Sequence, residues 1–254
     1  MQKGFYDLTS GMLTQNRILN NVSTNLTNVS TPGYKRDELM TTTFDERMQV
    51  RVGNIDKSNY TDLHDASMLR TVDEVYTVFE QGGFDNTGRS LDFAIYGDAF
   101  FEIQGDDGNT YYTRNGSFTL DEDGRLWLQN VGLVSGDDGN PITLGTDKIQ
   151  CDSDGKITDM SGNTLGTLRL VTFTDTDQLL KTDEGMFTNP DAGNVAADGD
   201  SEIKWQNLEN SNADLMEVMT QMITAERAFQ SASQVLKMLD ESLSLTVTEI
   251  SRFD

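Results

Sequence analysis

The sequence predicts an α+β fold in segregated layers. A heptad helix at each end forms a coiled-coil domain, and a central all-β domain, an antiparallel sandwich or a barrel-like sheet, lies between them. Apolar residues recur at steps of three and four near both ends of the 254-residue chain, which is the spacing of helices that pack along each other. Short β-branched and aromatic runs alternate with Asp-Gly turns in between, as in antiparallel β-domains. The expected segments are an N-terminal helix in 1–40, a linker or arm in 41–73, the β-domain in 74–203 and a C-terminal helix in 204–254.

The first predicted helix extends from Phe5 to Val29. Its seam steps through Phe5, Leu8, Met12, Gln15, Leu19, Val22, Leu26 and Val29. Pro32 and Gly33 end it, because proline cannot continue a helix and glycine permits a turn. Five asparagines weaken this helix, so we expect it to fold when its seam is covered; they are Asn16, Asn20, Asn21, Asn25 and Asn28.

A second helix is predicted near the other end of the chain. A seven-residue repeat contains Leu208, Leu215, Met222, Phe229, Leu236 and Leu243, and a second repeat contains Ser211, Val218, Ala225, Ala232 and Leu239. Residues 221–245 contain no glycine or proline. Ser211 or Asn212 is the expected N-cap. The two helices are expected to pair with each other or with the same helices of neighbouring copies.

The middle of the chain consists of predicted strands and tight turns. Asp-Gly dipeptides occur at residues 107–108, 123–124, 138–139 and 154–155, and glycine accepts the positive φ that such turns require. Apolar and aromatic runs between and after them are the candidate strands: 100–103, 110–114, 117–120, 125–128, 168–173 and 185–187. Residues 41–73 show no clean period and are expected to form a linker or an irregular arm, followed by a strand in 72–79.

The charge balance limits the classes of partner. The chain has 42 acidic and 19 basic residues, a net charge of -23, which repels the phosphates of nucleic acids and anionic membrane surfaces. No stretch approaches the ~18 consecutive apolar residues of a membrane helix, so we expect neither nucleic-acid binding nor membrane insertion. The single cysteine, Cys151, excludes an intramolecular disulfide. The N-terminus lacks a basic run followed by an apolar core, so no cleaved signal peptide is expected.

Residue patterns that would indicate catalysis or metal binding are not found. Asp121 and Asp152 begin stretches that look like calcium loops, but the fifth position of each holds a cation, Arg125 or Lys156, where an oxygen ligand is needed. We interpret both as hairpin turns. His64, the single histidine, has no second ligand nearby in sequence. Phosphate-binding and serine-nucleophile motifs do not occur, so the sequence predicts no enzyme, no cofactor and no metal.

The stretch from residue 20 to residue 36, NNVSTNLTNVSTPGYKR, carries a family resemblance. It resembles the N-terminal signature of bacterial flagellar axial proteins, the rod, hook and hook-associated family, which reads roughly NNLANxxTPGYK. Three extra residues follow the asparagine pair, and Thr27 stands where alanine is common. The resemblance implies an export or assembly motif made of Asn25, Leu26, Asn28, Thr31, Pro32, Gly33, Tyr34 and Lys35.

Three further blocks resemble the same family, in the family's order. Residues 81–101 are similar to QGxLxxTGxxLDxAIxGxGFF, with Ala99 in place of the usual glycine. Residues 112–124 are similar to YTRxGxFxLDxDG. Residues 208–215, LENSNADL, resemble LExSNVDL, and the ERAFQ that follows at 226–230 resembles ERAYQ. Together the blocks resemble the axial family over well over half of the chain. The length of the chain and its single modest β-region are similar to those of a rod protein rather than of the much longer hook or hook-associated proteins.

The resemblance implies a structural subunit of the flagellar basal-body rod, which would polymerise helically into the drive shaft between motor and hook. The expected partners are further copies, other rod or hook subunits and the flagellar type III export apparatus. The expected assembly interface is the seam, represented by Leu8, Met12, Leu19, Val22, Leu26, Val29, Leu215, Val218, Met222, Phe229, Leu236 and Leu239. An alternative is a secreted β-rich binding module or hydrolase with helical oligomerisation arms, which a pocket of converging carboxylates would favour.

Overall fold

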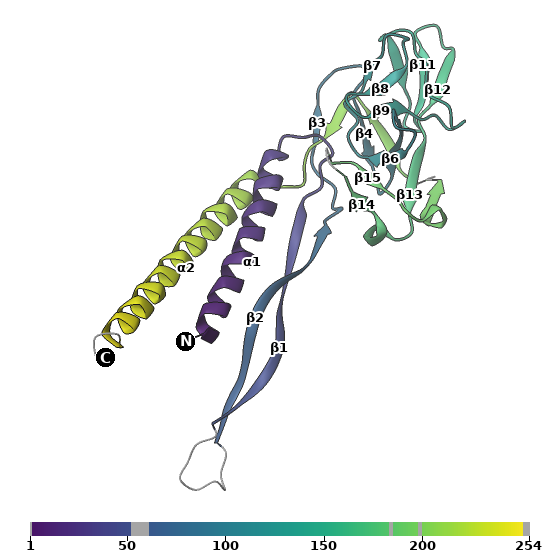
Figure 1. The fold of residues 1–254 in the computed structure, drawn as a ribbon. Coiled ribbons are helices and arrows are strands. Elements are labelled where there is room, and N and C mark those ends of the chain that lie inside the picture. Colours follow the sequence, from purple (N-terminus) through teal and green to yellow (C-terminus); the bar gives the residue numbers. More distant parts are fainter. Residues whose placement is uncertain (1, 52–60, 183–184, 198–199, 251–254) are drawn as a thin grey trace. The chain divides into compact units, whose positions relative to one another are not determined.

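The computed structural model describes residues 2–51, 61–182, 185–197 and 200–250. The chain divides into two compact units, each considered by itself below (Figure 1). The terminal unit consists of residues 1–26, 37–76 and 215–254, and the β-unit consists of residues 27–36 and 77–214. The predicted α+β class is confirmed, because a mostly β central region lies between an N-terminal and a C-terminal helix.

Two helices belong mainly to the terminal unit: α1 (Gln2–Thr27) and α2 (Leu215–Ile250). Helix α1 ends closer to the N-terminus than predicted, and α2 begins closer to the C-terminus. Helix α1 stops two residues before Val29, which lies in the turn that follows. Helix α2 begins after Ser211 and Asn212, so neither is its N-cap. Leu208 lies in strand β18 (Asn207–Glu209), so the seven-residue repeat extends beyond the helix that it indicates.

The terminal unit also contains β1 (Asp37–Arg51) and β2 (Thr61–Thr77), which pair in a two-stranded sheet (Figure 1). These strands replace the irregular arm expected in this part of the chain. Residues 41–44, Thr-Thr-Thr-Phe, are β-branched or aromatic and favour extended backbone. A strict two-residue alternation would have indicated a strand, and its absence explains the error. His64 falls in β2, but its side chain lies outside the described ones.

The β-unit contains the remaining strands, and the pairings described among them are antiparallel. Besides β18, the strands are β3 (Phe84–Asn86), β4 (Phe93–Tyr96), β5 (Phe100–Gly105), β6 (Thr110–Thr113), β7 (Thr119–Leu120), β8 (Leu126–Leu128), β9 (Gly132–Val134), β10 (Ile149–Cys151), β11 (Lys156–Asp159), β12 (Thr164–Thr167), β13 (Leu170–Phe173), β14 (Leu180–Lys181), β15 (Phe187–Thr188), β16 (Val195–Ala197) and β17 (Glu202–Trp205).

The largest sheet of the β-unit has nine strands. Seven of them follow the order β14-β15-β6-β5-β9-β8-β7, β13 pairs with β5, and β16 pairs with β13. A three-stranded sheet has the order β10-β11-β12, and two-stranded sheets join β17 to β4 and β18 to β3. The described strands do not close into a barrel, so the barrel-like alternative is wrong. The last two pairs bring residues 202–209 back to residues 84–96.

The predicted Asp-Gly turns are confirmed at all four positions. Gly108, Gly124, Gly139 and Gly155 have φ between 74° and 82°, in the left-handed region that favours glycine. Each glycine N–H donates to the carbonyl oxygen three residues earlier, at 2.8–3.0 Å. Each glycine is therefore the fourth residue of its turn, a preferred place for glycine in type I turns.

The core of the β-unit is made of aromatic and branched aliphatic side chains. Phe93, Phe101 and Phe118 are fully buried, and the rings of Phe101 and Phe118 meet edge to face with centroids 5.1 Å apart. Cys151 packs against this core, and burial raises the pKa of its thiol to about 12, so the thiol keeps its proton at neutral pH. Within the described residues, no helix has the length and apolar character needed to cross a membrane.

Candidate assembly surface and signature-motif network

Helix α2 has one stripe of shielded side chains, and it coincides with the predicted seam. Val218 and Ala225 are buried, and the other members are half-buried: Met222, Phe229, Ala232, Leu236 and Leu239. Every other residue from 219 to 246 is exposed. Leu215, at the start of the helix, and Leu243, the last residue of the predicted repeat, are exposed, at 43% and 37%. A continuous apolar stripe with charged residues elsewhere is the form of a helix that packs along another helix.

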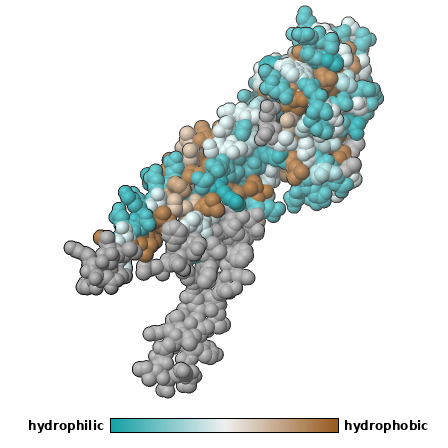
Figure 2. All heavy atoms as spheres, in the orientation of Figure 1, coloured by the Kyte–Doolittle hydropathy of each residue, from teal (hydrophilic) through white to brown (hydrophobic). Residues whose placement is uncertain are grey.

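Helix α1 has a broader shielded face. Val22 is buried, and the other predicted seam residues with described side chains are half-buried: Leu8, Met12, Gln15, Leu19 and Leu26. Leu13 lies off this face and is 60% exposed. The side chain of Phe5, the first predicted seam residue, is outside the described ones. Figure 2 shows hydrophobic side chains, in brown, along the helices of the terminal unit.

The two helices line a common groove of about 620 Å³ in the terminal unit. Gln15 and Ile18 come from α1. Helix α2 contributes Met216, Glu217, Thr220, Gln221, Thr224 and Ala225. Met216 is 74% exposed although it is a large apolar residue. The groove thus leaves apolar surface of both helices accessible in the single chain.

Two of the asparagines in α1 hold the start of β1. Asn21 and Asn25 each donate from their side-chain amide to the carbonyl oxygen of Asp37, at 2.8 Å. Asn25 also accepts from the backbone N–H of Asp37 at 3.0 Å. Asn25 is 5% exposed, and a buried amide needs such partners. These asparagines therefore have a structural role that their low helix propensity did not suggest.

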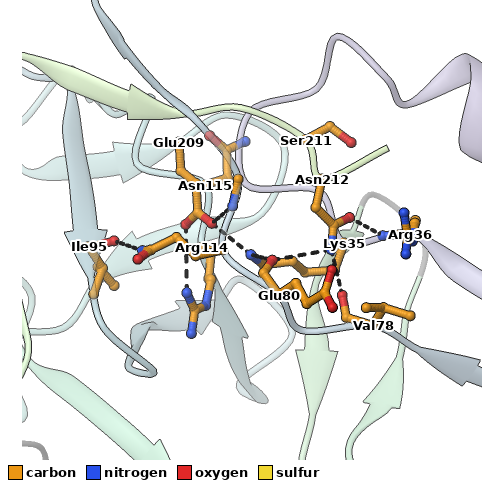
Figure 3. A network of polar contacts seen from close by, with 12 residues as sticks. Lys35, Arg36, Val78, Glu80, Ile95, Arg114, Asn115, Glu209, Ser211 and Asn212 are labelled. Carbon is orange, nitrogen blue, oxygen red and sulfur yellow. Dashed lines mark hydrogen bonds and ion pairs between the residues drawn. The ribbon is translucent and has the colours of Figure 1, made fainter. Parts of the chain in front are cut away.

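A buried ion pair in the β-unit joins residues that are far apart in sequence (Figure 3). Lys35 Nζ lies 2.6 Å from Glu209 Oε1, and both side chains are fully buried. Lys35 also donates to the carbonyl oxygen of Glu80 at 2.7 Å, and the N–H of Gly82 donates to Glu209 Oε1 at 3.0 Å. These hydrogen bonds give Lys35 and the Oε1 atom of Glu209 further polar partners inside the protein, as buried charges require, whereas Glu209 Oε2 accepts no hydrogen bond from the described residues.

A second cation shares the same carboxylate. Arg114 Nη1 lies 3.8 Å from Glu209 Oε2, which is ion-pair rather than hydrogen-bond distance. The guanidinium carbon also lies 4.8 Å from the centre of the Phe100 ring, a cation–π contact. Burial lowers the pKa of Lys35, and the neighbouring Arg114 lowers it further, whereas Glu209 opposes both effects. Burial likewise lowers the pKa of Arg114. Glu209 is thus the anion that opposes the effect of burial on the pKa of both cations.

Two glycines allow the backbone to close around this network. Gly33 has φ of 68°, its N–H donates to the carbonyl oxygen of Glu209 at 2.7 Å, and an added Cβ would lie 2.4 Å from the backbone of Arg114. At Gly82, a Cβ would lie 2.0 Å from the carbonyl oxygen of Asn210. Real Cβ atoms do not approach backbone so closely, so only glycine fits at these two positions.

Asn212 completes the network beside Lys35 (Figure 3). Its side chain accepts from the N–H of Arg36 at 2.7 Å and donates to the carbonyl oxygen of Val78 at 2.7 Å. This use of the side chain explains why Asn212 does not cap α2. Lys181 donates to the carbonyl oxygen of Lys35 at 2.6 Å and lies over the ring of Tyr34, 4.0 Å from its centre.

The network brings together all four sequence blocks that carry the family resemblance. Lys35 belongs to the first block, Gly82 to the second, Arg114 to the third and Glu209 to the fourth. Sequence reasoning placed Lys35 in an export or assembly motif and did not single out Arg114 or Glu209. The available signal was a charged residue inside three of these blocks, Lys35, Arg114 and Glu209. Within the described residues no cluster of three or more histidines, cysteines or acids could hold a metal ion.

Two family models match parts of the chain. The model described as "Flagellar hook protein FlgE/F/G D1 domain" matches residues 94–159, from β4 to the end of β11. The model described as "Flagellar basal body rod FlgEFG protein C-terminal" matches residues 206–248. The second match includes Glu209, Asn212 and almost all of α2, so it covers part of the network and the α2 seam.

Similar proteins match nearly the whole chain. The flagellar basal-body rod protein FlgG of Bacillus subtilis (strain 168) is 32% identical, over 96% of this chain and 97% of its own length. FlgG of Agrobacterium fabrum is 29% identical over 93% of this chain and 95% of its own length. The flagellar basal-body rod protein FlgF of Caulobacter vibrioides is 28% identical over 99% of this chain and 98% of its own length.

Proposed function

Since this chain belongs to the family of bacterial flagellar basal-body rod proteins, we propose that it polymerises helically through its terminal helices into the drive shaft between motor and hook. It is a structural subunit of the rod, and its family is not an enzyme class. The location that follows is the flagellar basal body. Its partners are further copies of the chain and other rod or hook subunits. The family supports this function over the alternative of a secreted binding module or hydrolase.

The observation that carries the proposal is the shielded stripe of α2. From Val218 to Leu239 the stripe keeps strict three- and four-residue steps, which is the requirement for continuous helix-to-helix packing. Most of its members are only half-buried in the single chain, so neighbouring copies have apolar surface left to cover. Coiled-coil contacts through this stripe, including contacts to Leu215, are the proposed basis of assembly. Contacts of this kind that do not close on themselves build tubes and filaments.

Export by the flagellar type III system is the second part of the proposal. Its support is the family relationship together with the composition of α1. Asn16 and Asn20 lower the helix propensity of this segment, and such a segment is easily kept unfolded during passage through a narrow export channel. We propose the family motif, from Asn25 to Lys35, as the part of the chain that serves export and assembly.

A charge in the seam is expected to block polymerisation. In the Leu236→Asp variant, packing would bury a carboxylate without a partner, which costs roughly 2 kcal/mol or more and weakens association about thirtyfold. The critical concentration for polymerisation, measured by sedimentation and electron microscopy, should rise accordingly. Tryptophan fluorescence should be unchanged, because Trp127 and Trp205, the two tryptophans, lie in the β-unit.

Ser233→Asp is the matched control. Ser233 is exposed and lies between the seam residues Ala232 and Leu236 in sequence, so this variant adds the same charge to the same helix turn without burying it. It should polymerise like the unmodified chain. Normal polymerisation of Leu236→Asp would refute assembly through the α2 seam.

A further inference from the structure

The groove between α1 and α2 remains open in the single chain, and one side of α1 is chemically suited to fill it. Ile18 and Met216 give the groove an apolar part, while Glu217 on its α2 side is exposed and carries a negative charge. A segment that complements this groove needs an exposed apolar residue with a cation close by. Leu13 and Arg17 of α1 provide these two groups. Both are exposed, and residues four apart lie on one helix face.

The charge distribution indicates where this partner comes from. The chain has 42 acidic residues, yet residues 8–36 contain none, and Arg17 gives this stretch of α1 an exposed positive charge, ten residues after the exposed Asp7. The exposed charges of α2 are mostly acidic: Glu217, Glu226, Asp240 and Glu241 against Arg227 and Lys237. An α2-to-α2 contact between copies would therefore bring like charges together, whereas an α1-to-α2 contact joins opposite ones.

We propose that the groove binds the exposed face of α1 from a second copy of this chain, with Leu13 in the apolar part and Arg17 paired with Glu217. This inference rests on the proposed function, because it names the surfaces through which the rod subunits meet. The contact is heterologous, since each copy offers its groove to one neighbour and its α1 face to another. Such contacts continue from copy to copy and produce an open helical array.

Charge reversal in separate copies tests the pairing. Arg17→Glu places two acids at each contact, and Glu217→Lys places two cations there. Each variant alone should polymerise at a critical concentration at least about tenfold higher than the unmodified chain, because like charges at an interface cost on the order of 1.4 kcal/mol or more. Both residues are exposed, so circular dichroism of the monomers should be unchanged.

An equal mixture of the two variants is the decisive sample. In a polymer that alternates them, one contact pairs the new glutamate of the Arg17→Glu copy with the new lysine of the Glu217→Lys copy. The next contact pairs the unchanged Arg17 and Glu217, so polymerisation should return to within about twofold of the unmodified chain. Pairing inside one chain could not be restored by mixing. A mixture as weak as either variant, with the unmodified chain polymerising, would overturn the groove contact and leave assembly through the seam standing. An unmodified chain that does not polymerise would contradict both.

Discussion

Replacing Glu209 with alanine is expected to destabilise the β-unit by about 3–5 kcal/mol, because removing one partner of a buried ion pair leaves the other charge uncompensated. Here two cations, Lys35 and Arg114, would lose their shared anion in fully buried positions. The N–H of Gly82 donates to the side chain of Glu209, and the N–H of Gly33 donates to its backbone carbonyl oxygen. The site is therefore sensitive to both charge and geometry. Urea unfolding followed by tryptophan fluorescence reports on this unit and gives the free energy of unfolding.

Two variants make the result interpretable. Glu202→Ala removes an exposed carboxylate from β17 and should change the free energy of unfolding by less than about 0.5 kcal/mol. Glu209→Gln keeps an oxygen acceptor but loses the charge, so its unfolding free energy should lie between those of Glu209→Ala and the unmodified protein. If Glu209→Ala and Glu202→Ala had the same free energy of unfolding, the network around Glu209 would not stabilise the β-unit.

The second large effect is expected at Gly33, with Gly88 as its control. Both glycines have nearly the same positive φ, 68° and 69°, so alanine at either position carries the same backbone penalty of about 1–2 kcal/mol. The space around them differs. A Cβ at Gly33 would lie 2.4 Å from backbone atoms of Arg114 and Asn115, whereas a Cβ at Gly88 would meet nothing within 4 Å.

Gly33→Ala should therefore cost at least about 2 kcal/mol more than Gly88→Ala, because a collision with backbone cannot be relieved by a side-chain rotation. Urea unfolding measures both variants under the same conditions. Equal losses of stability would show that φ alone explains the requirement for glycine at position 33. They would also show that the loop bearing Lys35 is not held as closely against Arg114 as the structure indicates.

Features that depend on neighbouring residues could be predicted from the sequence. The α2 seam follows from helical periodicity alone, and each residue between Val218 and Leu239 that the repeat selects is shielded. The Asp-Gly turns follow from the freedom of glycine, as Gly124 with φ of 74° illustrates. The sequence blocks that resemble flagellar proteins indicate the family, which the similar proteins confirm.

Features that depend on residues far apart in the sequence could not be predicted. Lys35 and Glu209 are 174 positions apart, and no local pattern indicates that they form one ion pair. Their meeting requires β18 to pair with β3, more than 100 positions earlier in the chain, which is a property of topology. Asn25 is by propensity a weak helix former, whereas in the structure its amide holds Asp37 at the start of β1. The strands β1 and β2 escape prediction because their residues alternate between apolar and polar only over short stretches, such as residues 47–51.

The most direct test of helix-mediated assembly is amide hydrogen exchange in the free chain and in the polymer. If α1 and α2 carry the contacts, amides of residues 8–26 and 218–239 should exchange at least about tenfold more slowly in the polymer, while those of β5 and β6 change little. Because helix and strand amides are measured in the same sample, protection confined to the helices is distinguished from a general stabilisation of the chain. Slower exchange in β5 and β6, with α1 and α2 unchanged, would contradict the proposed role of the helices.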